Sequence, residues 1–229
     1  MHSNSPHLSS YEAIIFDMDG VVLDSEPLHK KAQRAVLDRY GITIPPSASE
    51  TFTGMTEADV FAHVAAHYAP GRVAASEMIA HKHREYASRI QELEMIPGAL
   101  ELICRLEALN IPLGLVTSAT RQDQERAFSH FGLSKFFRKV VTVEDVTCPK
   151  PDPEPYLLMA QRLEVSPTRC LVIEDSAYGI RAAVQARCYV IGLATSFPVD
   201  VLPSFGCHEV VVSLADLETH LFADCAVTA

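Results

Sequence analysis

The clearest indication of the fold of this 229-residue chain is the segment Ala13-Ile14-Ile15-Phe16-Asp17-Met18-Asp19-Gly20. Its first four residues are apolar without alternation, which predicts a short strand covered on both faces, as in a parallel sheet. The strand ends in the carboxylates of Asp17 and Asp19, and Gly20 allows a sharp turn behind them. Similar apolar runs recur downstream, at residues 111–116, 140–141, 170–173, 189–191 and 209–212.

Helical patterns fill the spaces between these runs. They cover residues 99–109, 121–131, 153–163 and 176–186. The third segment starts with prolines, which the first turn of a helix tolerates, and the fourth starts with Ser176, a residue type that caps helices. Strands that alternate with helices predict an α/β fold with a parallel sheet and right-handed crossovers. We therefore expect a Rossmann-like, three-layer core.

One long segment interrupts this alternation after the first strand. Residues 25–94 contain no convincing strand and instead show helical patterns at 30–40, 57–68 and 74–93. This predicts a small α-helical domain of residues 25–94, inserted into an α/β catalytic core formed by residues 1–24 and 95–229.

Composition and charge exclude several classes of function. The formal net charge of -10 argues against sequence-independent nucleic-acid binding, which needs a basic face. No segment reaches the roughly 20 apolar residues that a membrane-spanning helix needs. The six cysteines form no C-x-x-C pair, which is typical of reduced thiols in a cytoplasmic protein. We expect a cytoplasmic monomer with neither a nucleic-acid nor a membrane partner.

Polar residues follow the predicted strands at the points where they end. These residues are Asp17, Asp19, Thr117, Ser118, Lys150, Glu174 and Asp175. Ligands of open α/β sheets bind beyond the carboxyl ends of the strands, so these side chains should converge on one pocket. Crowded carboxylates repel one another unless a cation lies among them, and an all-oxygen donor set favours Mg²⁺. Together with an ammonium and a hydroxyl group, such a cation can bind a phosphate dianion.

These segments resemble the four motifs of the haloacid dehalogenase (HAD) superfamily in order and spacing. They are Phe16-Asp17-Met18-Asp19-Gly20-Val21-Val22, Thr117, Lys150-Pro151 and Glu174-Asp175-Ser176. The helical insertion lies where that superfamily has its C1-type cap, and the resemblance covers residues 11–220. It implies a phosphoryl-transfer enzyme that works through an aspartyl-phosphate.

The resemblance also implies a role for each matching carboxylate. Asp17 would attack phosphorus, and Asp19 would protonate the leaving alcohol and then deprotonate the hydrolytic water. Mg²⁺ would be held by the Asp17 carboxylate, the Asp19 main-chain carbonyl and Asp175. Glu174 would be a further ligand or would lie behind the ligands.

Thr117 and Lys150 would bind the phosphoryl oxygens, with help from the amide of Ser118, although Thr117 and Ser118 could exchange roles. Asp19 separates this chain from the superfamily's dehalogenases, which lack that aspartate, and favours phosphate esters as substrates.

Two branches of the superfamily are similar to this chain. Asp24-Ser25-Glu26-Pro27-Leu28-His29 resembles the hinge of the β-phosphoglucomutase-like branch, where the mutase also has a histidine, and Lys82 falls where the mutase has a substrate-binding lysine. Glu57, which follows Gly54-Met55-Thr56, falls where the mutase has an arginine for a second phosphate. A carboxylate there would repel that phosphate, which argues against a mutase.

The sugar- and glycerol-phosphate phosphatases form the other branch. The segments that resemble it are Thr117-Ser118-Ala119-Thr120-Arg121, Lys150-Pro151-Asp152-Pro153-Glu154-Pro155-Tyr156-Leu157 and Gly192-Leu193-Ala194-Thr195-Ser196-Phe197. We therefore expect a Mg²⁺-dependent phosphatase that hydrolyses a small sugar or polyol phosphate, with His29, Gly54, Glu57 and Lys82 as candidate cap residues for substrate binding. A phosphomutase of the β-phosphoglucomutase type is the alternative. A regulatory module that binds metal and phosphate without catalysis is a third reading.

Overall fold

The computed structural model describes residues 7–45, 52 and 57–222. The chain divides into two compact units: Met1–Asp24 with Glu94–Ala229, here named the core unit, and Ser25–Leu93, here named the cap unit. No helix in the described ranges is long and apolar enough to cross a membrane. The described cysteines are free thiols: Cys104, Cys148, Cys170, Cys188 and Cys207.

A parallel sheet forms the centre of the core unit. In the described residues it has six strands, in the order β5-β4-β1-β6-β7-β8. Their bounds are β1 Ala13–Phe16, β4 Leu113–Val116, β5 Lys139–Val141, β6 Cys170–Glu174, β7 Tyr189–Leu193 and β8 Glu209–Val211. Each strand pairs in parallel with its neighbours, and every residue of β1 is buried. The predicted α/β fold is confirmed.

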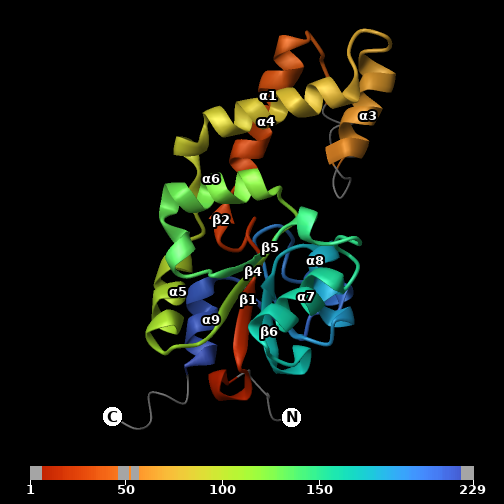
Figure 1. The fold of residues 1–229 in the computed structure, drawn as a ribbon. Helices are drawn as coiled ribbons and strands as arrows, with labels where there is room; N and C mark the ends of the chain where they lie inside the picture. Colours follow the sequence, from red (N-terminus) through yellow and green to blue (C-terminus); the bar gives the residue numbers. More distant parts are fainter. Residues whose placement is uncertain (1–6, 46–51, 53–56, 223–229) are drawn as a thin grey trace. The chain divides into compact units, whose positions relative to one another are not determined.

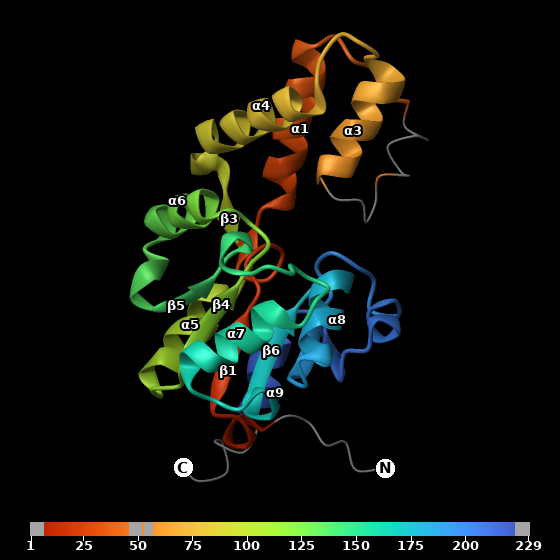
Figure 2. The same ribbon diagram turned by 45° about the vertical axis from the view of Figure 1, so that its right-hand side comes forward.

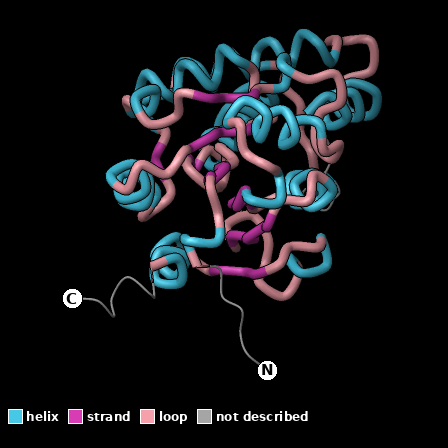
Figure 3. The backbone as a smooth tube through the Cα atoms, turned by 60° about the horizontal axis from the view of Figure 1, so that its bottom comes forward, coloured by secondary structure: helices cyan, strands magenta, loops and turns pink. Residues whose placement is uncertain are grey.

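Helices cover both faces of this sheet. Their bounds are α5 Ala99–Ala108, α6 Arg121–Phe131, α7 Glu154–Leu163, α8 Ala177–Gln185 and α9 Leu214–Leu221. Helix α7 packs against β4 and β5, and α8 packs against β6 and β7. Helices α5 and α9 pack against each other on the opposite face (Figure 1; Figure 3). Short 3₁₀ turns lie at Leu8–Ser10, Leu133–Lys135, Val143–Asp145, Pro167–Arg169 and Leu202–Phe205.

Local chemistry sets the ends of these elements. Strand β4 begins at Leu113 rather than at the predicted residue 111, because Pro112 has no amide hydrogen to donate to a neighbouring strand. Helix α8 begins after Ser176, whose hydroxyl accepts a hydrogen bond from the Gly179 amide at 3.0 Å. The N-cap that was predicted at Ser176 is therefore present.

A small second sheet was not foreseen from the sequence. Strands β2 (Leu23–Asp24) and β3 (Glu94–Met95) pair antiparallel, with Leu23 opposite Met95. Two-residue strands leave no periodicity to recognise, and these two lie about 70 residues apart, so only the folded chain brings them together. The helical insertion consequently follows β2 rather than β1.

The cap unit is a group of packed helices. Helix α1 (Glu26–Arg39) and helix α3 (Glu57–Tyr68) both pack against α4 (Ala75–Ser88), as Figure 2 shows. Their shared apolar core contains Val36, Phe61 and Met78. The prediction of a helix over residues 74–93 was wrong at its end. A 3₁₀ turn at Ile90–Glu92 replaces the last helical turn, because Leu93 adopts the extended conformation that leads into β3.

Candidate active site

Strand β1 places Asp17 at the carboxyl edge of the sheet, between its two neighbours. The Asp17 amide donates to the Ile173 carbonyl at 3.0 Å, and the Asp17 side chain is buried. A hydrogen bond of 2.7 Å from the Gly20 amide to the Leu23 carbonyl closes the following turn. Gly20 has a φ of 78°, and a Cβ there would lie 1.9 Å from Oδ2 of Asp175. The turn therefore depends on glycine at this position.

The ammonium group of Lys150 links the strands around Asp17. Its Nζ donates to Asp17 Oδ1 at 2.5 Å, to Glu174 Oε1 at 2.7 Å and to the Val116 carbonyl at 3.2 Å. The same nitrogen lies 5.1 Å from the centroid of the Tyr156 ring. Burial acts to lower the pKa of Lys150, but the carboxylates beside it raise the pKa above its ordinary value. The ammonium therefore stays charged in this buried position.

Glu174 accepts hydrogen bonds on both of its carboxylate oxygens. In addition to Lys150, the Tyr156 hydroxyl donates to Oε1 at 2.8 Å. Oε2 accepts from the amides of Asp175 and Ser176, each at 3.0 Å, and from the Ser176 hydroxyl at 2.9 Å. Burial acts to raise the pKa of Glu174, but Lys150 and these donors lower it. Glu174 is therefore an ionised anchor that fixes Lys150 on one side and the start of α8 on the other.

Asp175 faces the turn after β1 and the loop after β7. The Ser196 hydroxyl donates to Asp175 Oδ2, and Oγ of Thr195 lies 3.3 Å from the same oxygen. The Thr195 hydroxyl also donates to the Gly20 carbonyl at 2.6 Å. Burial raises the pKa of Asp175 to about 7, and the nearby Glu174 carboxylate adds to this effect.

Asp17, Glu174 and Asp175 form a buried acidic group that can hold a metal ion. One carboxylate oxygen from each residue lies within 4.8 Å of the other two. Burial raises the pKa of Asp17 well above its ordinary value; Lys150 acts against this, and the carboxylates of Glu174 and Asp175 add to it. One ammonium cannot balance three carboxylates, so a divalent cation would relieve the remaining repulsion. The all-oxygen donor set suits a hard cation.

The other predicted core residues surround this group or extend from the same loops. Asp19 is half-buried and lies in the turn after β1, where it forms a bridge with Leu23. Thr117 is buried, its amide donates to the Val141 carbonyl at 2.9 Å, and its hydroxyl oxygen accepts from the Ala119 amide at 2.9 Å. Ser118 is exposed.

Among the candidate cap residues, Glu57 and Lys82 form an ion pair, whereas His29 packs against an aromatic ring. Glu57 accepts from Lys82 on one carboxylate oxygen and contacts Nε2 of His83 at 2.7 Å with the other. Burial acts to raise the pKa of Glu57, but the Lys82 ammonium lowers it, so this carboxylate is ionised. His29 stacks on the Tyr86 ring with the centroids 4.5 Å apart. Gly54 lies outside the described residues.

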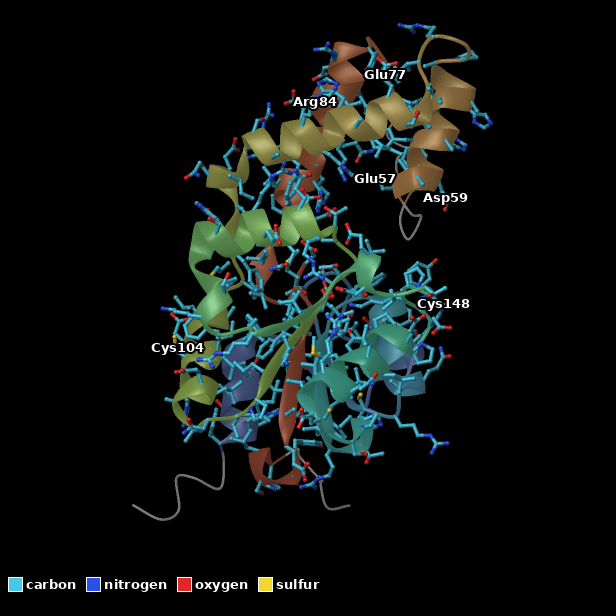
Figure 4. All side chains as sticks on the ribbon, in the orientation of Figure 1. Glu57, Asp59, Glu77, Arg84, Cys104 and Cys148 are labelled. Carbon is cyan, nitrogen blue, oxygen red and sulfur yellow. The ribbon has the colours of Figure 1, made fainter. Side chains whose placement is uncertain are left out.

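Figure 4 shows Glu57 on α3 and, in the core unit, Cys148 in the loop before α7. Cys148, Asp152 and Glu154 form a second group of potential metal ligands in the described part of the chain. The Glu154 carboxylate, however, accepts from the amides of Thr147 and Cys148 at 2.9 and 2.7 Å. These hydrogen bonds explain why the three residues lie together: the Glu154 carboxylate holds the backbone of the loop before α7.

Sequence reasoning assigned no role to Tyr156, Thr195 or Ser196. All three lie in the segments that resemble sugar-phosphate phosphatases, which was the available signal. Their contacts with Glu174 and Asp175 cross between separate elements, so the sequence alone could not reveal them.

Known proteins of similar sequence show which family this chain belongs to. The family model described as haloacid dehalogenase-like hydrolase matches residues 14–193. A validoxylamine A 7'-phosphate phosphatase of Streptomyces hygroscopicus subsp. limoneus is 31% identical over 84% of this chain and 90% of its own length. A fructose-1-phosphate phosphatase of Escherichia coli is 32% identical over 77% of this chain and 93% of its own length.

Solved structures agree with these relatives. The crystal structure of a candidate β-phosphoglucomutase from Thermotoga maritima is 30% identical and superposes with a TM-score of 0.79, covering 94% of this chain and 99% of that chain. The shared sequence motifs, the parallel sheet and the extent of these matches lead to one conclusion. The chain belongs to the haloacid dehalogenase-like hydrolases.

Proposed function

We propose that this chain is a Mg²⁺-dependent phosphatase that hydrolyses a small sugar or polyol phosphate monoester through a phosphorylated Asp17. The observation that carries the proposal is the position of the Asp17 carboxylate, which contacts Lys150 and lies among Glu174 and Asp175. The names of the two phosphatase relatives, which concern phosphorylated carbohydrates or carbohydrate-like compounds, support the substrate class.

Four groups of the core unit are proposed to hold the cation. They are the Asp17 and Asp175 carboxylates, the Asp19 main-chain carbonyl and, as a further ligand or behind the others, Glu174. When bound, Mg²⁺ would offset the charge of the carboxylates and of the phosphoryl oxygens, so that two anions can approach each other.

The first half of the reaction uses both aspartates of the turn. An oxygen of the Asp17 carboxylate forms a bond to phosphorus while the bond from phosphorus to the alcohol oxygen breaks. The Asp19 carboxyl group donates its proton to the leaving alcohol. Lys150, Thr117 and Ser118 bind the phosphoryl oxygens and stabilise the charge that they carry.

The second half returns the enzyme to its starting state. Asp19, now a carboxylate, removes a proton from a water molecule, and the water oxygen bonds to phosphorus. The bond from phosphorus to Asp17 breaks and inorganic phosphate leaves. In this scheme Glu174 and Tyr156 orient Lys150 and do not touch the substrate.

The cap unit is proposed to recognise the organic part of the substrate through His29, Gly54, Glu57 and Lys82. The pairing of Glu57 with Lys82 supports a monophosphate substrate, because a lysine already neutralised by a carboxylate attracts a second phosphate poorly. The same pairing speaks against a phosphomutase, which must bind two phosphates. We also propose that the enzyme is a cytoplasmic monomer that acts on a small phosphorylated metabolite and has neither a nucleic-acid nor a membrane partner.

The experiment is phosphate release from a panel of sugar, polyol and nucleoside monophosphates, with Mg²⁺ and with EDTA. Mg²⁺-dependent release from a few sugar or polyol phosphates supports the proposal. A well with β-glucose 1-phosphate and a trace of glucose 1,6-bisphosphate detects the alternative. Formation of glucose 6-phosphate there without release of phosphate would make the chain a mutase, and no turnover of any phosphate ester would overturn both.

A further inference from the structure

The loop after β7 contacts both segments that carry the aspartates of the site. The Ser196 hydroxyl donates to Asp175 Oδ2, and the Thr195 hydroxyl donates to the Gly20 carbonyl at 2.6 Å. Gly20 belongs to the turn that contains Asp19, and Asp175 follows β6. Thr195 and Ser196 are themselves exposed, whereas the Asp175 residue is 2% exposed. Two surface hydroxyl groups therefore reach inward to a buried carboxylate and to the turn beside it.

The contacts distinguish the two oxygens of the Asp175 carboxylate. Among the described residues, the hydrogen bonds to this side chain end on Oδ2, where Ser196 donates and Thr195 lies at 3.3 Å. The close approach of Gly20 falls on the same oxygen, since a Cβ at Gly20 would lie 1.9 Å from Oδ2 but 3.3 Å from Oδ1. Oδ2 is thus packed and hydrogen-bonded, and Oδ1 is the oxygen left for a cation.

Thr195 has one hydroxyl proton and two acceptors within reach. The distance to the Gly20 carbonyl is 2.6 Å and the distance to Asp175 Oδ2 is 3.3 Å, so the proton lies mainly toward Gly20. Ser196 then provides the main hydroxyl donor to Asp175. The two hydroxyl groups therefore hold different segments: Thr195 holds the turn after β1, and Ser196 holds the Asp175 carboxylate after β6.

We propose that Thr195 and Ser196 are positioning residues that set the rotamer of Asp175 and hold the turn after β1 against it, so that Oδ1 of Asp175 and the Asp19 carbonyl meet a divalent cation in the correct geometry. This inference rests on the proposed function, because it concerns the same cation site. It goes further by assigning part of the cation affinity to a loop that supplies no ligand of its own.

Hydrogen-bond partners that orient metal ligands are worth about 10- to 100-fold in metal affinity or activity when they are removed. Ser196→Ala removes the donor to Asp175, and Thr195→Val removes the donor to Gly20 while keeping a similar shape. We expect each substitution to raise the dissociation constant for Mg²⁺ by about 10-fold or more. The conservative variants Ser196→Thr and Thr195→Ser keep the hydroxyl groups and should keep most of the affinity.

The test is calorimetric titration of Mg²⁺ into each protein, prepared with EDTA and dialysed free of it, without any substrate. Ser204→Ala and Thr219→Val are matched controls, because their hydroxyl groups bond the Val201 and Ala215 carbonyls away from the site. Urea unfolding in EDTA accompanies the titration and must show that all six variants are folded before Mg²⁺ is added, because a lost hydrogen bond to a buried carboxylate can itself lower the midpoint.

Weaker Mg²⁺ binding in Ser196→Ala and Thr195→Val, with both controls and both conservative variants near the wild type, supports the inference. Unchanged dissociation constants in the two test variants would overturn it, as would a wild-type protein that binds no Mg²⁺. Equal losses in the control variants would also overturn it. Since no substrate is present, failure of the phosphate-release panel would reject the proposed function without affecting this result.

Discussion

Gly179→Ala should damage the active site through Glu174, although it adds only one methyl group. A Cβ at residue 179 would lie 1.5 Å from Glu174 Oε1 and 2.3 Å from Oε2. The Glu174 carboxylate cannot simply move away, because Lys150, Tyr156 and Ser176 hold it from different directions. The substitution must therefore displace the carboxylate from these donors or distort the start of α8.

The magnitude follows from two opposing effects. Alanine favours a helix over glycine by up to about 1 kcal/mol. Separating Glu174 from Lys150 leaves a buried ammonium without one of its partners, and breaking a buried ion pair costs about 3–5 kcal/mol. We expect a net loss of about 2–4 kcal/mol in the free energy of unfolding. Turnover should fall about 100-fold, because Lys150 shifts relative to Asp17.

A double-mutant cycle tests whether Gly179→Ala lowers stability by displacing the Glu174 carboxylate. Urea unfolding measures the effect of Gly179→Ala in the wild type and in the Glu174→Ala variant. In the Glu174→Ala background the obstacle is gone, so Gly179→Ala should cost nothing or stabilise slightly. Gly114→Ala is the control, because its Cβ would meet Met159 Sδ at 2.5 Å rather than a carboxylate. It should lose stability but keep its turnover. An equal cost of Gly179→Ala in both backgrounds, or full activity in Gly179→Ala, would show that the substitution does not act through the Glu174 carboxylate.

Three further predictions concern single side chains. Tyr156→Phe removes the hydroxyl that donates to Glu174, so the free energy of unfolding should fall by about 1.5–3 kcal/mol; an unchanged urea midpoint would contradict this. Burial acts to raise the pKa of Asp145, but hydrogen bonds, first from a backbone amide, lower it from 3.8 to about 2. Its contribution to stability, at most about 2 kcal/mol, is present above pH 4 and is lost as the pH falls toward 2. Asp145→Asn should flatten the pH dependence of the urea midpoint over that range. An unaltered pH dependence would show that Asp145 does not carry this contribution. Glu57→Gln leaves Lys82 without its carboxylate partner, so a sugar bisphosphate should inhibit phosphate release with an inhibition constant about tenfold lower; an unchanged inhibition constant would show that this pair takes no part in substrate recognition.

The sequence predicts the sheet well because apolar runs without alternation are a strong local signal. The run that ends at Asp17 became β1, and the helix over 121–131 became α6 with the same bounds. The errors occur where long-range pairing decides the structure. Strands β2 and β3 form only because Leu23 meets Met95, and the same pairing ends the preceding helix early.

The same distinction separates the site residues that could be predicted from those that could not. Asp17, Glu174 and Asp175 carry motifs at strand ends, so their convergence follows from the fold class. Ser196 gave no comparable signal, because an exposed serine in a loop is ordinary until its hydroxyl is seen to reach Asp175. The ion pair of Glu57 with Lys82 depends in turn on the packing of α3 against α4.

The transferred phosphoryl group can be located directly, which tests whether Asp17 is the nucleophile. The enzyme is mixed with its best substrate and Mg²⁺, quenched in acid within one turnover, digested, and examined by mass spectrometry. Asp19→Asn is run beside it to slow hydrolysis of the intermediate. We predict one phosphoryl group on Asp17 in both proteins and none in Asp17→Asn, which should be inactive but folded. A phosphoryl group on any other residue, or steady turnover by Asp17→Asn, would contradict it.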